Sequence, residues 1–257
     1  NASGRVHGAA YSLIDLNRAG VPLVEIVSRP DIRTSEEARQ YVSELRAILV
    51  AIGASDAKME EGSMRVDANV SVRKPNAPFG TRCEIKNVNS IRSLGRAIDY
   101  EARRQIDLIE NGGAVRQETR HWDENDGRTH TLRTKEDADD YRYFLEPDLV
   151  ALDPDESWRE RIRTSLPALP RQRRDALVAL LTKATDAQRD AINTVVDLDL
   201  DHYVSAVATA KGDVSIALAR VANEIAADVT TATNLSVDAF VATVQMESSG
   251  ALTATQA

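Results

Sequence analysis

The fold is decided by Met64-Arg65-Val66-Asp67-Ala68-Asn69-Val70-Ser71-Val72-Arg73, a stretch in which apolar or small residues alternate strictly with polar ones. Successive side chains of a β-strand point to opposite faces of the sheet, so this alternation predicts a strand with two different faces. After a loop with two prolines, residues 81–88 repeat the pattern, with Cys83 and Ile85 on the apolar side and three charged residues opposite: Arg82, Glu84 and Lys86. We therefore predict a β-hairpin with one apolar and one densely charged face.

The residues before this hairpin carry one strand signal and one helix signal. Val21–Val27 is a nearly continuous apolar run between a glycine and a proline, which predicts a buried strand. Thr34 and Glu37 have the spacing of a capping box, and apolar residues recur at helical spacing over residues 38–52. We expect an amphipathic helix there that ends at Gly53.

The residues after the hairpin predict another helix and a second hairpin. The helix begins near Ser90 and ends at Gly112-Gly113, and its expected apolar stripe is Ile91, Leu94, Ile98, Ala102, Ile106 and Ile109. Alternation returns in Val115–Trp122, and Asp126-Gly127 marks a turn before a strand at Arg128–Arg133.

The character of the chain changes after Pro154, where strand signals vanish and helix formers dominate. We expect an α+β domain over residues 1–153 and an all-helical domain over residues 154–257. The chain begins with Asn1 rather than Met, so we interpret it as a piece of a longer protein.

Composition limits the class of protein. The chain has 257 residues, of which 42% are hydrophobic, and no apolar run approaches the roughly 20 residues that span a bilayer. Its single cysteine, Cys83, excludes an internal disulfide and suits a reducing compartment. We expect a soluble, cytoplasmic protein with no membrane partner.

The net charge of −8 does not exclude a nucleic-acid partner, because the charge is unevenly spread. Residues 184–257 hold three basic and ten acidic side chains, a net of −7 that leaves the remainder near neutral. A basic stretch could contact RNA phosphates or could equally be a solvated helix face: Arg159, Arg161, Arg163, Arg171, Arg173 and Arg174.

The charged face of the first hairpin is the best candidate for chemistry. Asp67 and Glu84 lie on adjacent strands among basic residues, and carboxylate oxygens are the ligands that Mg²⁺ requires. The alternative is a solvated sheet face with cross-strand ion pairs, which is the commoner outcome for this pattern. Glu25, inside the apolar run, is either an exposed edge residue or a buried charge that needs a cation.

Other classes of site have little support. There is no glycine-rich phosphate loop or dinucleotide fingerprint. The four histidines have no zinc spacing, and His121 and His130 flank the Asp126-Gly127 turn as expected surface residues. Cys83 lies on the apolar face, which favours an inert packed thiol over a nucleophile.

Four longer motifs resemble one known family, the B subunit (GatB) of the glutamyl/aspartyl-tRNA amidotransferase. They occur in the family's order and with similar spacing, at Tyr11–Val27, Lys58–Arg73, Glu84–Ser90 and Asp140–Phe144. They are distributed over most of the range 5–150, and four long motifs in order are far more specific than one short pattern.

The resemblance implies a fold and a reaction. The expected fold is α+β, an open antiparallel sheet forming a glutamine synthetase-like cradle, followed by helices. The family uses ATP and Mg²⁺ to phosphorylate the side-chain carboxylate of Glu-tRNA(Gln) or Asp-tRNA(Asn). Ammonia released from glutamine by the A subunit then displaces the phosphate, and a small C subunit clasps the other two.

The resemblance also implies roles for individual residues. By motif match, Glu25, Asp67 and Glu84 are expected metal ligands. The residues beside these ligands are assigned from their chemistry and not by motif match. Lys86 and Arg65 are expected catalytic groups for phosphate or substrate, and three asparagines are expected nucleotide contacts: Asn69, Asn87 and Asn89.

The chain departs from the family in three places. It lacks the family's N-terminal section, with further metal ligands, and the C-terminal tail that binds the tRNA elbow. Leu145 also replaces a customary proline. We therefore expect no kinase activity from this chain alone. The main alternative is a non-catalytic module for tRNA binding and subunit docking, and a weaker one is a free-standing amino-acid ligase that accepts free glutamate.

Overall fold

The computed structural model describes residues 21–134, 150–229, 234–253 and 255–256. The chain divides into two units, Asn1–Arg33 and Thr34–Ala257. The predicted motif at Asp140–Phe144, the departure at Leu145 and most of the motif that begins at Tyr11 lie outside the described residues.

The buried strand predicted at Val21–Val27 is wrong. This segment has no regular secondary structure and its residues are all exposed, with Leu23 at 92% and Val24 at 77%. An extended apolar run becomes a buried strand only when a neighbouring strand forms hydrogen bonds with its backbone N–H and C=O groups and other elements pack over its side chains. No strand among the described residues pairs with it.

The first predicted helix is confirmed as α1, Ser35–Ala51. The Thr34 side chain accepts a hydrogen bond from the Glu37 backbone, and the Glu37 carboxylate accepts one from the Thr34 backbone, so the capping box is complete. Gly53 follows the helix with a φ of 68°, a conformation that glycine adopts without steric cost.

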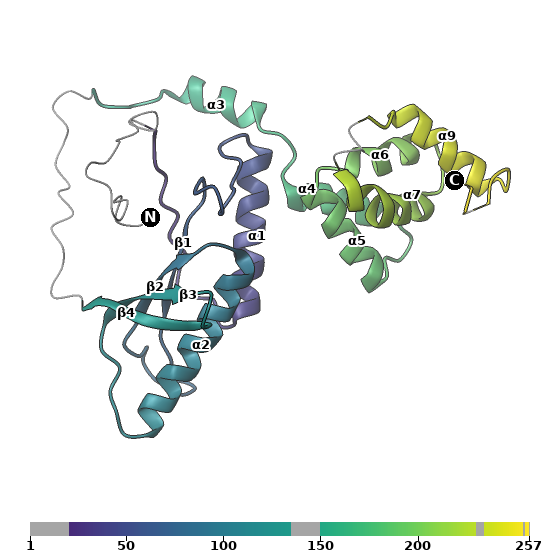
Figure 1. Ribbon diagram of the computed structural model, residues 1–257. Helices are drawn as coiled ribbons and strands as arrows, with labels where there is room; N and C mark the ends of the chain where they lie inside the picture. The colour runs from purple at the N-terminus through teal and green to yellow at the C-terminus, as the bar shows by residue number, and fades with distance from the viewer. Residues whose placement is uncertain (1–20, 135–149, 230–233, 254, 257) are drawn as a thin grey trace, which may run out of the picture. The chain divides into compact units, whose positions relative to one another are not determined.

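Four strands form one sheet in the order β1-β2-β3-β4 (Figure 1). The strands are β1 (Val66–Val70), β2 (Cys83–Val88), β3 (Glu118–Asp123) and β4 (Arg128–Thr134). The two predicted hairpins are confirmed, because β1 pairs with β2 and β3 pairs with β4 in antiparallel fashion.

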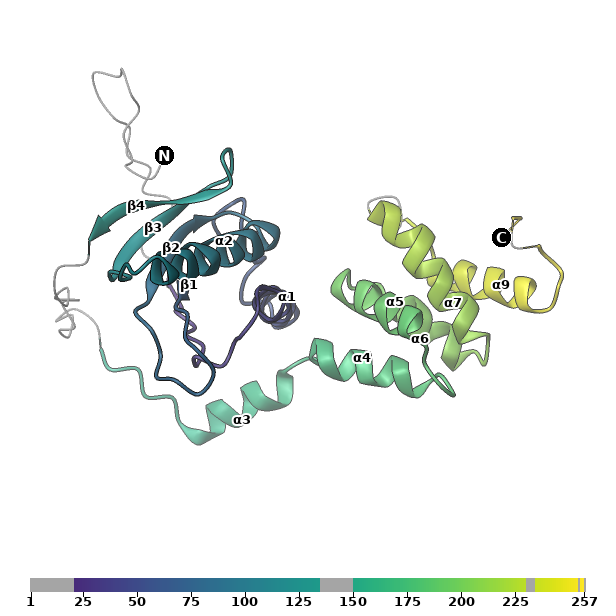
Figure 2. The ribbon, with the colours of Figure 1, turned by 90° about the horizontal axis from the view of Figure 1, so that it is seen from below.

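The sheet differs from the expected antiparallel one at its centre, where β2 and β3 run parallel. Parallel neighbours need a crossover connection, and helix α2 (Ile91–Glu110) provides it. Ser90 caps this helix, as predicted, by accepting a hydrogen bond from the Ser93 backbone. Figure 2 shows α2 lying along one face of the sheet, with α1 beside it.

The buried stripe of α2 is not the one predicted. Leu94 is buried as expected, but Ile106 and Ile109 are 43% and 47% exposed. Glu101 and Gln105 are instead fully buried against the sheet. Polar partners on the strands explain this rotation of the helix, because a buried polar group is stable only when it is hydrogen-bonded.

These partners form a buried ionic network centred on Glu101. Its carboxylate accepts hydrogen bonds from Arg104, Gln105 and Thr129, and the guanidinium of Arg120 lies 3.3 Å away. Gln105 also donates to the backbone carbonyl of β1 at Val70. Burial pushes the pKa of Glu101 upward, but the hydrogen bonds from these three side chains and the charge of Arg104 outweigh burial, so its pKa is lowered.

An apolar core lies between the sheet and α2, and Cys83 and Ile85 from β2 are fully buried in it. Burial, with the nearby Glu101 carboxylate, raises the pKa of the Cys83 thiol to about 11. The thiol is therefore protonated at neutral pH, in agreement with the predicted inert side chain.

All described elements after residue 150 are helical. They are α3 (Glu156–Ser165), α4 (Pro170–Ala179), α5 (Asp186–Asp197), α6 (Asp201–Thr209), α7 (Val214–Arg220), η1 (Val221–Ile225), η2 (Ala226–Asp228) and α9 (Val237–Ser248). Elements from α4 onward share a second hydrophobic core, which includes Leu177, Ile192, Val204, Leu218 and Val244. Within the described ranges, no helix combines the length and the apolar character needed to span a membrane.

Candidate functional site

The charged side of the first hairpin faces away from α2. Cys83 of β2 is buried on the α2 side, where its Sγ accepts a hydrogen bond from Arg104 of α2 at 3.7 Å. Because side chains alternate along a strand, Glu84 and Lys86 project from the other side of the sheet. Asp67 and Asn69 of β1 share that side, because Asn69 lies directly opposite Glu84 in the strand register. This gathers residues of both strands on one open surface.

Lys86 joins the two carboxylates on this surface. Its Nζ lies 2.9 Å from Oδ2 of Asp67 and 3.5 Å from Oε1 of Glu84. The hydrogen bond to Asp67 outweighs the effect of burial and raises the pKa of Lys86, so this lysine is charged throughout the neutral range. Both carboxylates therefore already share one positive charge.

A buried threonine holds Glu84 from the neighbouring strand. Thr119 of β3 lies opposite Glu84 in the parallel register, and its Oγ1 donates a hydrogen bond to Oε2 of Glu84 at 3.0 Å. Thr119 is fully buried, whereas the Glu84 side chain is 17% exposed. Sequence reasoning missed Thr119, because the contact depends on a parallel pairing that no local pattern of residues signals.

The other predicted site residues are all exposed. Arg65 is exposed just before β1, and Asn69 and Asn89 are also exposed. Asn87 has a left-handed backbone with a φ of 64°, and its side-chain amide donates to the backbone carbonyl of Trp122 on β3. The structure thus gives Asn87 a role in joining β2 to β3.

Glu25 lies in the first unit, in the exposed segment described above. The side chain is exposed, as in the first of the two alternatives, but it does not lie on the edge of a strand. Its expected role as a metal ligand stays a prediction.

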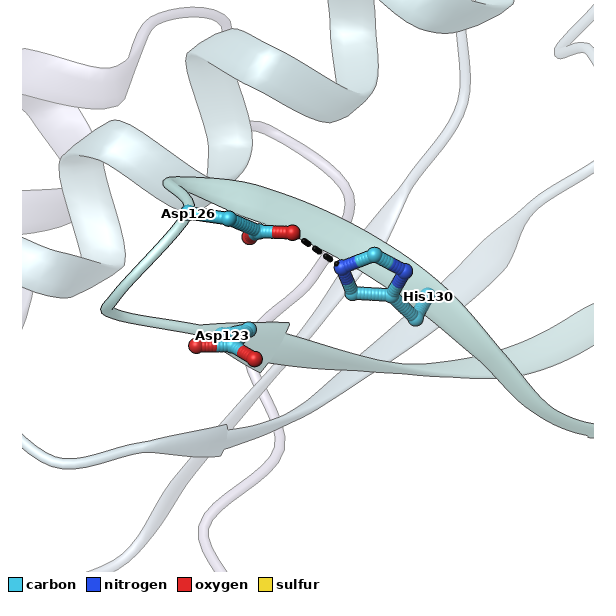
Figure 3. Close-up of side chains that lie close together, drawn as sticks. All are labelled: Asp123, Asp126 and His130. Atoms are coloured by element: carbon cyan, nitrogen blue, oxygen red, sulfur yellow. Dashed lines mark hydrogen bonds and ion pairs between the residues drawn. The ribbon is translucent and has the colours of Figure 1, made fainter.

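A second group of potential ligands lies at the turn between β3 and β4, where sequence reasoning expected only surface residues. Ligand atoms of Asp123, Asp126 and His130 lie within 4.8 Å of one another (Figure 3). His130 Nε2 is 2.7 Å from Oδ2 of Asp126, and the other oxygen of Asp126 accepts the Arg128 backbone N–H. Asp123 accepts the Asn125 backbone N–H. These hydrogen bonds within the turn explain why the three side chains lie close together without a metal ion.

The basic stretch predicted near residues 159–174 is largely neutralised by acidic partners. Arg173 pairs with Asp199 at 2.6 Å and also with Asp201. Arg174 pairs with Asp197 at 3.3 Å and also with Glu44. Their side chains are 17% and 18% exposed, so these two arginines are structural ion-pair partners and not part of a solvated helix face.

Comparison with known proteins identifies the family. A family model described as the GatB/GatE catalytic domain matches residues 1–160. The B subunit of the aspartyl/glutamyl-tRNA(Asn/Gln) amidotransferase from Sinorhizobium fredii is 57% identical over 169 residues, which are 66% of this chain and 34% of that protein. Its counterpart from Frankia casuarinae is 55% identical over 184 residues, 69% of this chain and 36% of that protein.

A longer match reaches into the helical part. The corresponding B subunit from a Rhodopseudomonas palustris strain is 47% identical over 215 residues, 83% of this chain and 44% of that protein. The chain thus spans from 34% to 44% of the length of these curated relatives. On the strength of the family model and these identities, the chain belongs to the GatB/GatE catalytic-domain family.

Proposed function

We propose that this chain is part of the amidotransferase subunit that activates mischarged tRNA. The whole subunit phosphorylates the side-chain carboxylate of Glu-tRNA(Gln) or Asp-tRNA(Asn) with ATP, and it does so in the cytoplasm. Ammonia from a glutaminase A subunit then replaces the phosphate, with a C subunit completing the heterotrimer. The main support is the match of residues 1–160 to the GatB/GatE catalytic domain, together with the identity to amidotransferase B subunits.

The residues on this surface fit a divalent cation. Asp67 and Glu84 project from paired strands toward one positive charge, so their oxygens already surround a place where a cation is stable. Mg²⁺ held by these carboxylates would neutralise the charge that develops on the transferred phosphate. Glu25 is proposed as a further metal ligand from its motif match alone.

The chain's own residues would bind and orient the substrates. Lys86 and Arg65 carry the positive charges that suit phosphate oxygens, and Asn69, Asn87 and Asn89 offer amides to the nucleotide. Thr119 and the paired strands hold the Glu84 carboxylate in place, so that little reorganisation is needed when charge develops.

The domain organisation is proposed on the same basis. Residues 1–153 would be the C-terminal part of a glutamine synthetase-like cradle, and residues 154–257 a helical domain. The second hydrophobic core, formed by helices α4 to α9, supports this division.

The test is transamidation of Glu-tRNA(Gln) by the complete subunit assembled with its partners. We expect Asp67→Ala and Glu84→Ala to abolish ATP-dependent activation while glutaminase activity and assembly stay intact. Glu36→Ala, which removes an exposed carboxylate paired with Arg39 on α1, is the matched control and should retain activity. Unchanged activity in the first two variants would make the charged surface purely structural.

The non-catalytic alternative makes a different prediction for this chain alone. A docking module would bind tRNA and the partner subunits without ATP or Mg²⁺. A chain that retains the carboxylate site should instead be protected against thermal unfolding when Mg²⁺ and ATP are added together. We expect that protection, but no transamidation by the isolated chain. A free-standing ligase, in contrast, would accept free glutamate in place of Glu-tRNA.

A further inference from the structure

Lys86 occupies the place between the two carboxylates. Its Nζ contacts one oxygen of Asp67 and one of Glu84, which come from different strands. The Lys86 side chain is 39% exposed, so its amino group can leave these oxygens for solvent. An ammonium group in this position does what a bound cation would do, because it neutralises both carboxylates at once.

We propose that Lys86 is a tethered cation that competes with the divalent metal for Asp67 and Glu84, and that metal binding releases its amino group toward the substrate phosphates. This inference rests on the proposed function of the same surface. It adds an order of events, in which the lysine becomes available only after the metal is bound.

Competition follows from the size and charge of the two cations. Magnesium binds carboxylate oxygens at about 2.1 Å, closer than the ammonium group that now lies between them. The two cations cannot occupy the same position, and their like charges repel each other in any neighbouring position. The metal has the larger charge, whereas the lysine has a flexible stem that lets it move away.

The two carboxylates are held in place by contacts that do not involve Lys86. Asp67 lies on β1 and Glu84 on β2, and backbone pairing holds these strands together. Thr119 holds the Glu84 oxygen that does not face Lys86. Only the lysine among these groups has a long mobile side chain, so metal binding is expected to displace Lys86 rather than the strands.

The first experiment measures metal affinity on the complete chain with Mn²⁺ as the probe, followed by electron paramagnetic resonance. Removal of a positive charge so close to the site should tighten Mn²⁺ binding by about tenfold in Lys86→Met. Arg73→Met is the matched control, since Arg73 contacts the Ala77 carbonyl and the Phe79 ring instead. Weaker or unchanged binding in Lys86→Met overturns the proposal, as does the absence of binding in both proteins.

The second experiment uses the unaltered chain and follows Lys86 itself. Its acetylation by a limiting acylating reagent, measured by mass spectrometry, should increase several-fold when Mn²⁺ saturates the site. Lys58, which pairs with Glu61 at 2.9 Å, is the internal control and should not change. Lower or unchanged labelling of Lys86 would show that the metal does not release it.

Both measurements need neither ATP nor tRNA, so they separate this inference from the proposed function. Release of Lys86 without transamidation by the assembled complex would sustain the inference and refute the enzymatic role. Transamidation that depends on Asp67 and Glu84, together with an unresponsive Lys86, would do the reverse.

Discussion

The two faces of the four-stranded sheet carry the same kinds of charged groups in opposite surroundings. On the α2 side, Glu101 is fully buried, accepts hydrogen bonds from three side chains and lies 3.3 Å from the guanidinium of Arg120. On the other side, Asp67 and Lys86 are 43% and 39% exposed and form a single cross-strand pair. Both faces thus join carboxylates to cations, but only on the α2 side is the carboxylate fully shielded from water.

The difference shows what burial does to an ion pair. A buried carboxylate must keep all its partners, because leaving one charge unpaired in the interior costs far more than a pair contributes at the surface. An exposed pair can exchange one cation for another at little cost in stability. The α2 face therefore specifies the fold, and the opposite face retains the freedom to bind a ligand.

The strongest test of this contrast is Glu101→Ala. It removes the fully buried carboxylate of the network and leaves Arg120 and Arg104 with Glu118 as their remaining counter-charge. We expect the free energy of unfolding to fall by about 3–5 kcal/mol. Urea unfolding followed by circular dichroism measures the change. A loss no larger than that of an exposed-pair variant would break the distinction between the faces.

The dependence of stability on pH in acid should also report on the ionic network around Glu101. The folded-state pKa of Glu101 is lowered, so its contribution to stability is complete above the ordinary value of 4.5 and is lost as the pH falls through the lowered pKa. We expect Glu101→Gln to flatten the dependence of unfolding free energy on pH below about 4.5. Exposed carboxylates elsewhere in the chain titrate in the same pH range, so the comparison is between the slopes of the variant and the wild type.

A smaller effect is expected for Thr119→Val, a change on the side of the sheet that faces away from α2. The substitution removes the hydroxyl that donates to Glu84 but keeps the volume of the side chain. We expect a loss of about 1 kcal/mol in unfolding free energy. Thr119→Ser should retain the hydrogen bond and weaken Mn²⁺ binding less than Thr119→Val. Equal metal affinities in the two variants would separate Thr119 from the site.

The smallest effect on stability is expected for Asp67→Asn. This variant removes one partner of an exposed pair, and such pairs contribute about 0–1 kcal/mol. Its effect should appear in metal affinity, which falls, rather than in the midpoint of urea unfolding. A stability loss as large as that of Glu101→Ala would show that the open face is structural after all.

Local signals in the sequence predicted the elements of the fold well. The Thr34 capping box and the alternation in β1 and β2 depend on neighbouring residues alone, and the structure has both. The α2 helix was predicted, but not which side of it is buried, because that side is chosen by Arg120, Thr129 and the Val70 carbonyl on distant strands. Val21–Val27 was mistaken for a buried strand for the related reason that hydrophobicity does not supply a pairing partner.

The candidate site was predictable to the same extent. Alternation correctly placed Asp67, Glu84 and Lys86 on one side of the hairpin. It could not show that the left-handed backbone at Asn87 interrupts the pattern, which turns Val88 to the buried side. Alternation also could not identify Thr119, because a side-chain hydrogen bond between parallel strands produces no periodic pattern in the sequence of either strand. The metal ligands and nucleotide contacts remain predictions.

The parallel pairing of β2 with β3 has a consequence for how the chain folds. Glu84 and Thr119 are separated by 35 residues, so their hydrogen bond forms only after a long loop has closed around α2. The antiparallel hairpins can form from nearby residues, whereas this central pairing has to wait for the helix to dock. The geometry around Glu84 is therefore a late product of folding, and hydrogen exchange at the β2–β3 amides should report when the binding surface is complete.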